Sequence, residues 1–89
     1  MIKIAFSPAF ERSFRKRFKG KRHLQERFWQ RVEIFLESPF DSRLRTHKLT
    51  GNLKELWSFS VEYDTRVVFY FVTDEKVVFV DIGTHDEVY

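Results

Sequence analysis

The chain has 89 residues, which is the size of one small domain, so we expect a single domain over residues 1–89. The absence of cysteine excludes a disulfide scaffold, a cysteine zinc site and a thiol nucleophile. The first six residues are too few for a signal peptide, and no apolar run reaches the length that crosses a membrane. We therefore expect a cytoplasmic protein with no membrane partner.

The net charge of +3 is unevenly distributed along the sequence. Residues 1–31 contain ten Lys or Arg and two acidic residues, a net charge of +8. Residues 32–89 contain six basic and eleven acidic residues, a net charge of −5. The basic part favours an anionic partner such as nucleic acid, although a solvated helix face explains the charge equally well.

The N-terminal part is expected to form a strand and two helices. Residues 1–6 alternate as a strand does. Ser7 is a suitable N-cap, Pro8 suits the first helical position and Gly20 suits the end of that helix. A second helix is expected over residues 21–37. Each helix has one apolar face, formed by Phe10, Phe14 and Phe18 in the first and by Leu24, Phe28, Val32 and Phe35 in the second.

The C-terminal part is expected to form the sheet. Residues 40–54 are irregular, with a short strand at their end. Residues 56–62, 66–72 and 76–82 predict an antiparallel meander, which the first strand joins. The sequence therefore predicts an α+β fold in the order β-α-α-β-β-β, with two helices packed on a mainly antiparallel four-stranded sheet.

Two histidines in loops are the first candidates for chemistry. His47 precedes the meander and His85 follows it, so we expect the two imidazoles to converge. Two imidazoles near neutral pKa can transfer protons in both directions, as RNA cleavage through the 2′-hydroxyl requires. Arg66, Lys48 and Lys54 are candidates to stabilise the phosphate charge.

Other residues allow more than one interpretation. Trp57 and Tyr89 are candidates for stacking on bases, but Trp57 alternates with core residues. Asp64 suits a turn. A zinc site formed by His47, His85 and Asp86 is an alternative, but no ligand spacing supports it and we expect neither metal nor cofactor.

Four segments together resemble a known family. They are residues 46–51 (Thr-His-Lys-Leu-Thr-Gly), 56–59 (Leu-Trp-Ser-Phe), 63–69 (Tyr-Asp-Thr-Arg-Val-Val-Phe) and 81–89 (Asp-Ile-Gly-Thr-His-Asp-Glu-Val-Tyr). Their combination resembles the RelE/ParE toxin superfamily, nearest its YafQ-like and RelE/StbE-type branch, over essentially the whole chain. The resemblance implies a toxin of a type II toxin–antitoxin pair that cleaves mRNA in the ribosomal A site without a metal.

The resemblance also implies site residues. His47 and His85 correspond to the loop and C-terminal histidines of the YafQ-like branch, and Tyr89 to its terminal aromatic residue. Asp64 matches an acidic residue of that branch, and Arg66 resembles the strand arginine of the RelE branch that holds phosphate. We expect these five residues to be catalytic.

A second set is expected to bind RNA and its phosphates. It comprises Arg45, Lys48, Lys54 and Trp57. Two positions depart from the YafQ-like pattern, because Ser60 stands where that branch has a histidine and Asp81 where it has an arginine. The assignment of acid and base therefore stays open.

The resemblance implies partners as well. They are a cognate acidic antitoxin, mRNA on the ribosome, and operator DNA that is bound only through the antitoxin complex. Two alternative functions share the fold: a ParE-like inhibitor of DNA gyrase, and a catalytically degenerate module that still binds the antitoxin.

Overall fold

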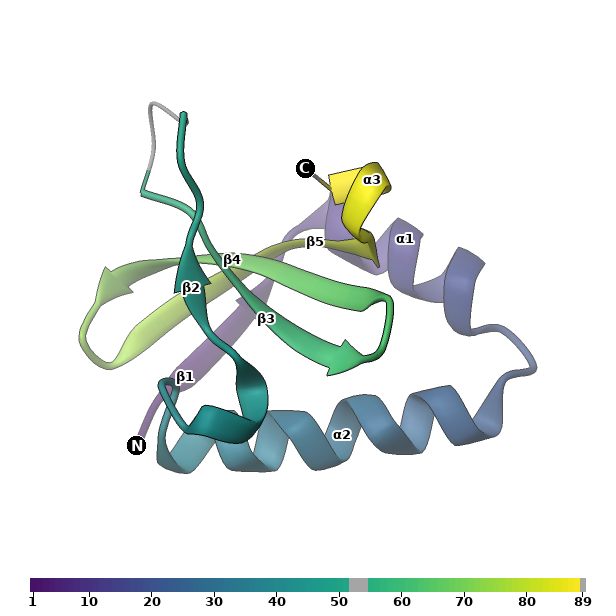
Figure 1. Cartoon of the computed structure of the whole chain (residues 1–89), viewed down its shortest axis with the longest axis horizontal. Coiled ribbons are helices and arrows are strands. Elements are labelled where there is room, and N and C mark those ends of the chain that lie inside the picture. Colours follow the sequence, from purple (N-terminus) through teal and green to yellow (C-terminus); the bar gives the residue numbers. More distant parts are fainter. Residues whose placement is uncertain (52–54, 89) are drawn as a thin grey trace.

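The computed structural model describes residues 1–51 and 55–88. In this part of the chain two long helices and a short C-terminal helix pack around one sheet (Figure 1). The elements are β1 (Lys3–Phe6), α1 (Pro8–Phe18), α2 (Arg22–Glu37), the 3₁₀ turn η1 (Ser42–Leu44), β2 (His47–Lys48), β3 (Trp57–Glu62), β4 (Thr65–Thr73), β5 (Lys76–Thr84) and α3 (His85–Val88). The predicted α+β class is confirmed, and the predicted elements occur in the predicted order, with β2 and α3 in addition.

The sheet has the strand order β1-β5-β4-β3-β2. β1 is parallel to β5 and the other neighbours are antiparallel, as the predicted meander requires. The described residues form five strands and not the predicted four, because His47 pairs with Ser58 and Lys48 with Trp57. This strand lies in the middle of residues 40–54 and not at their end. A strand of two residues has no periodicity, so only its pairing reveals it.

The start of α1 is tied to the sheet through one side chain. The Ser7 hydroxyl accepts a hydrogen bond from the Phe10 backbone N–H at 3.0 Å and donates one to the Val80 carbonyl at 2.8 Å. Pro8 occupies the first turn, as predicted. After α1, Gly20 has a φ of 71°, a left-handed conformation that glycine adopts without strain and that lets the chain reverse into α2.

Phenylalanine side chains fill the core between the helices and the sheet. Phe35 of α2 lies 5.1 Å from the ring of Phe59, 5.0 Å from Phe69 and 5.5 Å from Phe79. The four rings are fully buried, and each such pair contributes about 0.5–1.5 kcal/mol beyond the area that it buries. This packing fixes α2 along one side of the sheet (Figure 1).

The connection between β3 and β4 is shaped by a bulge. Ser60 pairs with Arg66 and Glu62 pairs with Thr65, with an irregularity between these two pairs. The tight turn that follows places Tyr63 and Asp64 at the tip of the hairpin. The hairpin therefore presents polar side chains on the side where α2 and η1 lie.

Candidate functional site

An open cleft of about 950 Å³ lies between α2, η1 and the β3–β4 hairpin. We call it the arginine cleft, because five arginines line it: Arg27, Arg31, Arg43, Arg45 and Arg66. Glu62 and Asp64 are the acidic residues along its wall. An excess of guanidinium groups in one concave surface attracts an anion with several phosphates.

Two of these arginines come from one face of α2. Arg27 and Arg31 are four residues apart, so their side chains leave the helix on the same side. Arg31 donates from Nε to the Val61 carbonyl at 3.3 Å and from Nη1 to the Arg43 carbonyl at 3.2 Å. Burial lowers the pKa of Arg31, and the charges of Arg27 and Arg43 lower it further. The cleft thus holds cations against their mutual repulsion, which a bound anion would relieve.

Two hydrogen-bond donors in the cleft are unpaired. The Nε atoms of Arg27 and Arg66 are buried and have no hydrogen-bond partner within the described part of the chain. Arg66 donates from Nη1 to the Ser60 hydroxyl, which orients its guanidinium. A buried donor without a partner costs about 1–3 kcal/mol, and each guanidinium would have to turn toward the cleft for this N–H to reach a phosphate oxygen.

Arg43 differs from these two because its charge is compensated. The Asp41 carboxylate accepts from Arg43 Nε at 3.0 Å, from Arg43 Nη2 at 2.9 Å and from the Arg43 backbone N–H at 2.9 Å. These side-chain and backbone hydrogen bonds lower the pKa of Asp41 to about 2. Asp41 thereby caps η1 and holds Arg43 at the edge of the cleft.

The end of η1 connects the cleft to the first histidine. Arg45 has a φ of 53°, in the left-handed region, and this turns the chain into β2. His47 Nδ1 lies 3.0 Å from the Arg45 carbonyl oxygen. Because a carbonyl only accepts, this contact requires a proton on Nδ1.

The family follows from a comparison of the sequence with family models. The model of YafQ, a bacterial toxin of type II toxin–antitoxin systems, matches residues 2–89. The chain belongs to the YafQ toxin family. No curated protein is similar enough in sequence to count as a match.

Solved structures of toxins share the fold of this YafQ-family chain. A metal-bound toxin from Helicobacter pylori is 22% identical with a TM-score of 0.79, and the alignment covers 100% of both chains. The DinJ–YafQ toxin–antitoxin complex of E. coli gives 22% identity and a TM-score of 0.73, covering 99% of this chain and 97% of that chain. A YoeB/ParE toxin from Agrobacterium tumefaciens is 13% identical with a TM-score of 0.78, and the alignment covers 94% of this chain and 99% of that chain. Similarity at these identities establishes the fold.

The structure gathers three of the predicted site residues in the arginine cleft. Arg45, Asp64 and Arg66 line it, together with Ser60. His85 lies near Asp64 along the sheet, because Thr65 pairs with Thr84. Asp64 precedes the first member of that pair and His85 follows the second, so both leave the same end of adjacent strands.

The predicted approach of the two histidines stays a prediction, and the sheet register gives only the separation of their strands. His47 pairs with Ser58, and the same row of the sheet continues through Val68 to Asp81. Three strand spacings of about 4.8 Å place His47 about 14 Å from β5 before any curvature of the sheet, and His85 is four residues beyond Asp81. The reason is the strand order, which puts β2 at the sheet edge and two strands between it and β5.

The predicted RNA-binding residues are in different environments. Lys48 forms an ion pair with Glu55 at 3.2 Å. Trp57 packs against Phe40 and Phe71, with ring centroids 5.2 and 6.1 Å away, which makes it part of an aromatic cluster. Lys54 and Tyr89 lie outside the described residues.

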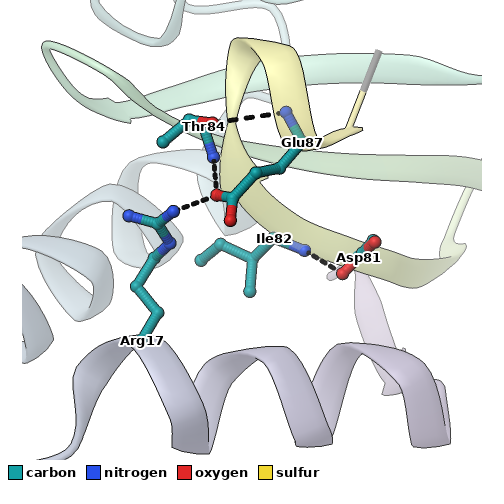
Figure 2. Close-up of polar contacts among 5 residues, drawn as sticks. All are labelled: Arg17, Asp81, Ile82, Thr84 and Glu87. Atoms are coloured by element: carbon teal, nitrogen blue, oxygen red, sulfur yellow. Dashed lines mark hydrogen bonds and ion pairs between the residues drawn. The ribbon is translucent and has the colours of Figure 1, made fainter.

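The two departures from the YafQ pattern have distinct structural consequences. Ser60 lies in the cleft and receives the Arg66 hydrogen bond. Asp81 lies outside the arginine cleft, and its Oδ1 accepts the Ile82 backbone N–H at 2.8 Å (Figure 2). A change at position 60 therefore alters the cleft directly, whereas Asp81 acts within β5.

Sequence reasoning missed three cleft residues, Arg27, Arg31 and Arg43. The spacing of four between Arg27 and Arg31 was a usable signal, but it does not say what the helix faces.

Within the described residues no helix is long and apolar enough to cross a membrane. No three His, Cys, Asp or Glu residues of that same part lie close enough to hold a metal ion.

Proposed function

We propose that this toxin is an endoribonuclease that cleaves mRNA, in the ribosomal A site, by metal-independent acid–base catalysis in the cytoplasm. One observation carries the proposal: five arginines line one cleft, and two of them, Arg27 and Arg66, each have a buried guanidinium N–H without a partner in the described part of the chain. Such a cleft fits a chain of phosphodiesters better than an isolated small anion, because the donors come from α2, η1 and the hairpin at once.

The proposed reaction is an intramolecular displacement at phosphorus. The 2′-oxygen forms a bond to phosphorus, its proton passes to a general base, and the bond from phosphorus to the 5′-oxygen breaks as a general acid protonates that oxygen. The products are a 2′,3′-cyclic phosphate and a 5′-hydroxyl. Arg66 supplies the charge that stabilises the pentacovalent intermediate.

We assign proton transfer to the end of the sheet where β4 begins and β5 ends. His85 and Asp64 leave adjacent strands there, and the Arg66 backbone pairs with Gly83. Tyr89 is proposed as a further catalytic group from the family resemblance. His47, beside Arg45, is proposed to act on the bound RNA on the other side of the cleft, since the register separates it from His85.

We assign RNA binding to the cleft and its neighbours. Arg45 contacts phosphates directly, and Lys48 does so when it exchanges its ion pair with Glu55 for RNA. Lys54 is proposed to bind phosphate on the basis of the family resemblance alone. Trp57 supports this side of the molecule through its packing on Phe40.

We propose an acidic antitoxin as the regulatory partner. An apolar groove of about 210 Å³ lies between β1, α1 and α2, lined by Phe6, Phe10, Phe14, Phe28 and Trp29 together with Glu11 and Arg15. Phe6 is 37% and Trp29 49% exposed, which is unusual for large apolar side chains. The two helices and the connection between them carry nine of the sixteen Lys and Arg residues, so an antitoxin segment with apolar anchors and acidic flanks fits. Operator DNA would then be bound through the antitoxin.

The loss of the family histidine at Ser60 favours a second candidate function. A toxin-fold module that binds the antitoxin and does not cleave RNA would keep the apolar groove and lose part of the catalytic set. This candidate predicts antitoxin binding with intact mRNA.

Induction of the chain in cells, followed by mapping of mRNA 5′ ends, separates the candidates. The endoribonuclease produces new 5′ ends within codons and arrests growth, and Arg66→Ala abolishes both. Arg12→Ala, which removes an exposed cation of α1, is the matched control and stays toxic. Soluble, antitoxin-free protein with normal mRNA ends would reject the proposed activity, and inhibition of purified gyrase would then identify a ParE-like toxin.

A further inference from the structure

The C-terminal helix α3 is held by a small network centred on Glu87. Glu87 Oε1 accepts the Thr84 backbone N–H at 2.8 Å, and the Glu87 backbone N–H donates to the Thr84 hydroxyl at 3.2 Å (Figure 2). This reciprocal pair is a capping box, which closes the first turn of a helix. The same carboxylate oxygen receives a hydrogen bond from Arg17 Nη2, across 70 residues of sequence.

Close packing at Gly83 supports this arrangement. A Cβ atom at Gly83 would lie 3.1 Å from Glu87 Oε1 and 3.1 Å from Val88 Cγ1. Gly83 is buried, so the space that a side chain would need is already occupied by α3. The turn from β5 into α3 is thus specified by Gly83, Thr84 and Glu87 together.

Arg17 connects this turn to a rigid element. It lies in the last turn of α1, and its side chain is 23% exposed against 59% for Glu87. α1 is anchored in the core through Phe14 and Phe18, whose ring centroids lie 5.0 and 5.9 Å from that of Phe28 in α2. A helix of four residues does not persist by itself in water, because nucleation outweighs the few bonds that it forms. The position of α3 therefore depends on its contacts with α1 and the sheet.

We infer that Arg17 and Glu87 are positioning residues, which hold α3 on α1 and so fix the backbone from which His85 acts. The role of His85 in cleavage rests on the proposed function, whereas the attachment of α3 to α1 does not. The ion pair is partly exposed, so its contribution to global stability is small. Its removal should release α3 without unfolding the sheet.

The test compares Arg17→Ala with Lys16→Ala in the full chain, made by cell-free synthesis to avoid toxicity. Lys16 lies on the same helix and lines the same small cleft as Arg17, Asp81 and Glu87, so the control removes an equal charge nearby. ¹⁵N relaxation and amide exchange report α3, and cleavage of an mRNA programmed into ribosomes gives kcat and KM.

For Arg17→Ala we expect at least a tenfold rise in amide exchange at Thr84 and Glu87, with exchange in the middle of β5 unchanged. We expect kcat to fall about tenfold at constant KM, and Arg17→Lys to restore part of both. Lys16→Ala should match the wild type in these measurements.

Unchanged α3 dynamics in Arg17→Ala would overturn the attachment, and mobile α3 with unchanged kcat would overturn its role in positioning His85. If the wild type cleaves no RNA, the proposed function fails, and the relaxation and exchange data alone still decide whether Arg17 holds α3.

Discussion

The two faces of α2 present opposite surfaces. Arg27 and Arg31 line the arginine cleft, whereas Phe28 and Trp29, on the other side of the same helix, line the apolar groove. The cleft contains guanidinium donors without partners, and the groove contains large aromatic side chains exposed to water. The cleft is lined by cationic side chains and the groove by aromatic ones. The two surfaces therefore fit different partners: a polyanion in the cleft and an apolar, acidic segment in the groove.

Phe28→Ala should damage both surfaces, with the largest effect. Phe28 is fully buried, and its ring lies 5.0 Å from Phe14 and 6.5 Å from Phe79, so it anchors α2 to both α1 and the sheet. We expect a loss of about 3–5 kcal/mol in the free energy of unfolding. Urea denaturation measures it. Trp29→Ala at the exposed neighbour is the control and should cost far less; equal losses would show that the core is not where the structure puts it.

Arg66→Ala should damage the cleft alone. Removal of a charged donor to the transition state typically lowers kcat about 10²–10³-fold. Cleavage of ribosome-bound mRNA measures this, while the affinity for the antitoxin should stay within about twofold of wild type. A matching loss of antitoxin binding would mean that the two surfaces are not independent.

Trp29→Ala should damage the groove alone. Exposed aromatic anchors contribute about 2 kcal/mol or more to an interface, which corresponds to a roughly 30-fold rise in the dissociation constant for the antitoxin. Calorimetric titration measures it, and RNA cleavage by the uninhibited variant should be unchanged. Wild-type affinity in this variant would place the antitoxin elsewhere.

The smallest effect concerns Asp41, at the edge of the cleft. Hydrogen bonds from Arg43 lower its pKa to about 2 in the folded chain, so its contribution to stability is present above its ordinary pKa and is lost as pH falls through about 2. NMR titration of the Asp41 carboxyl carbon should give a midpoint near 2. In Arg43→Ala the midpoint should rise towards about 3.9, and an unchanged midpoint would show that Arg43 is not the cause.

Periodic patterns predicted most of the fold, because each long element buries a regular face. Phe10, Phe14 and Phe18 indicated α1, and alternation around Phe59 with the apolar run around Phe69 indicated the meander. The position of β2 was not predicted exactly, because a strand of two residues is too short to show a periodic pattern. α3 was missed although Thr84 and Glu87 form a recognisable capping pair, because four residues are too few to show an apolar stripe.

The site was less predictable, since it depends on which distant segments pack together. Asp64 and Arg66 were expected from the family resemblance and Arg45 as an RNA-binding residue, and the three share one cleft. Arg27 joins them only because Phe35 and its neighbours fix α2 beside β3. The expected approach of His47 and His85 stays a prediction, because the distance between them depends on the strand order, which local sequence does not encode.

We propose that the arginine cleft holds an RNA backbone. The salt dependence of RNA binding tests this proposal most directly. The full chain carrying His85→Ala would be titrated with a single-stranded RNA oligonucleotide at several salt concentrations, with either Arg27→Gln or Arg12→Gln added. If Arg27 contacts a phosphate, Arg27→Gln lowers the slope of log K against log salt by about 0.7, while Arg12→Gln leaves it unchanged. Equal slopes for the two variants would contradict the proposal that the arginine cleft binds the RNA backbone through Arg27.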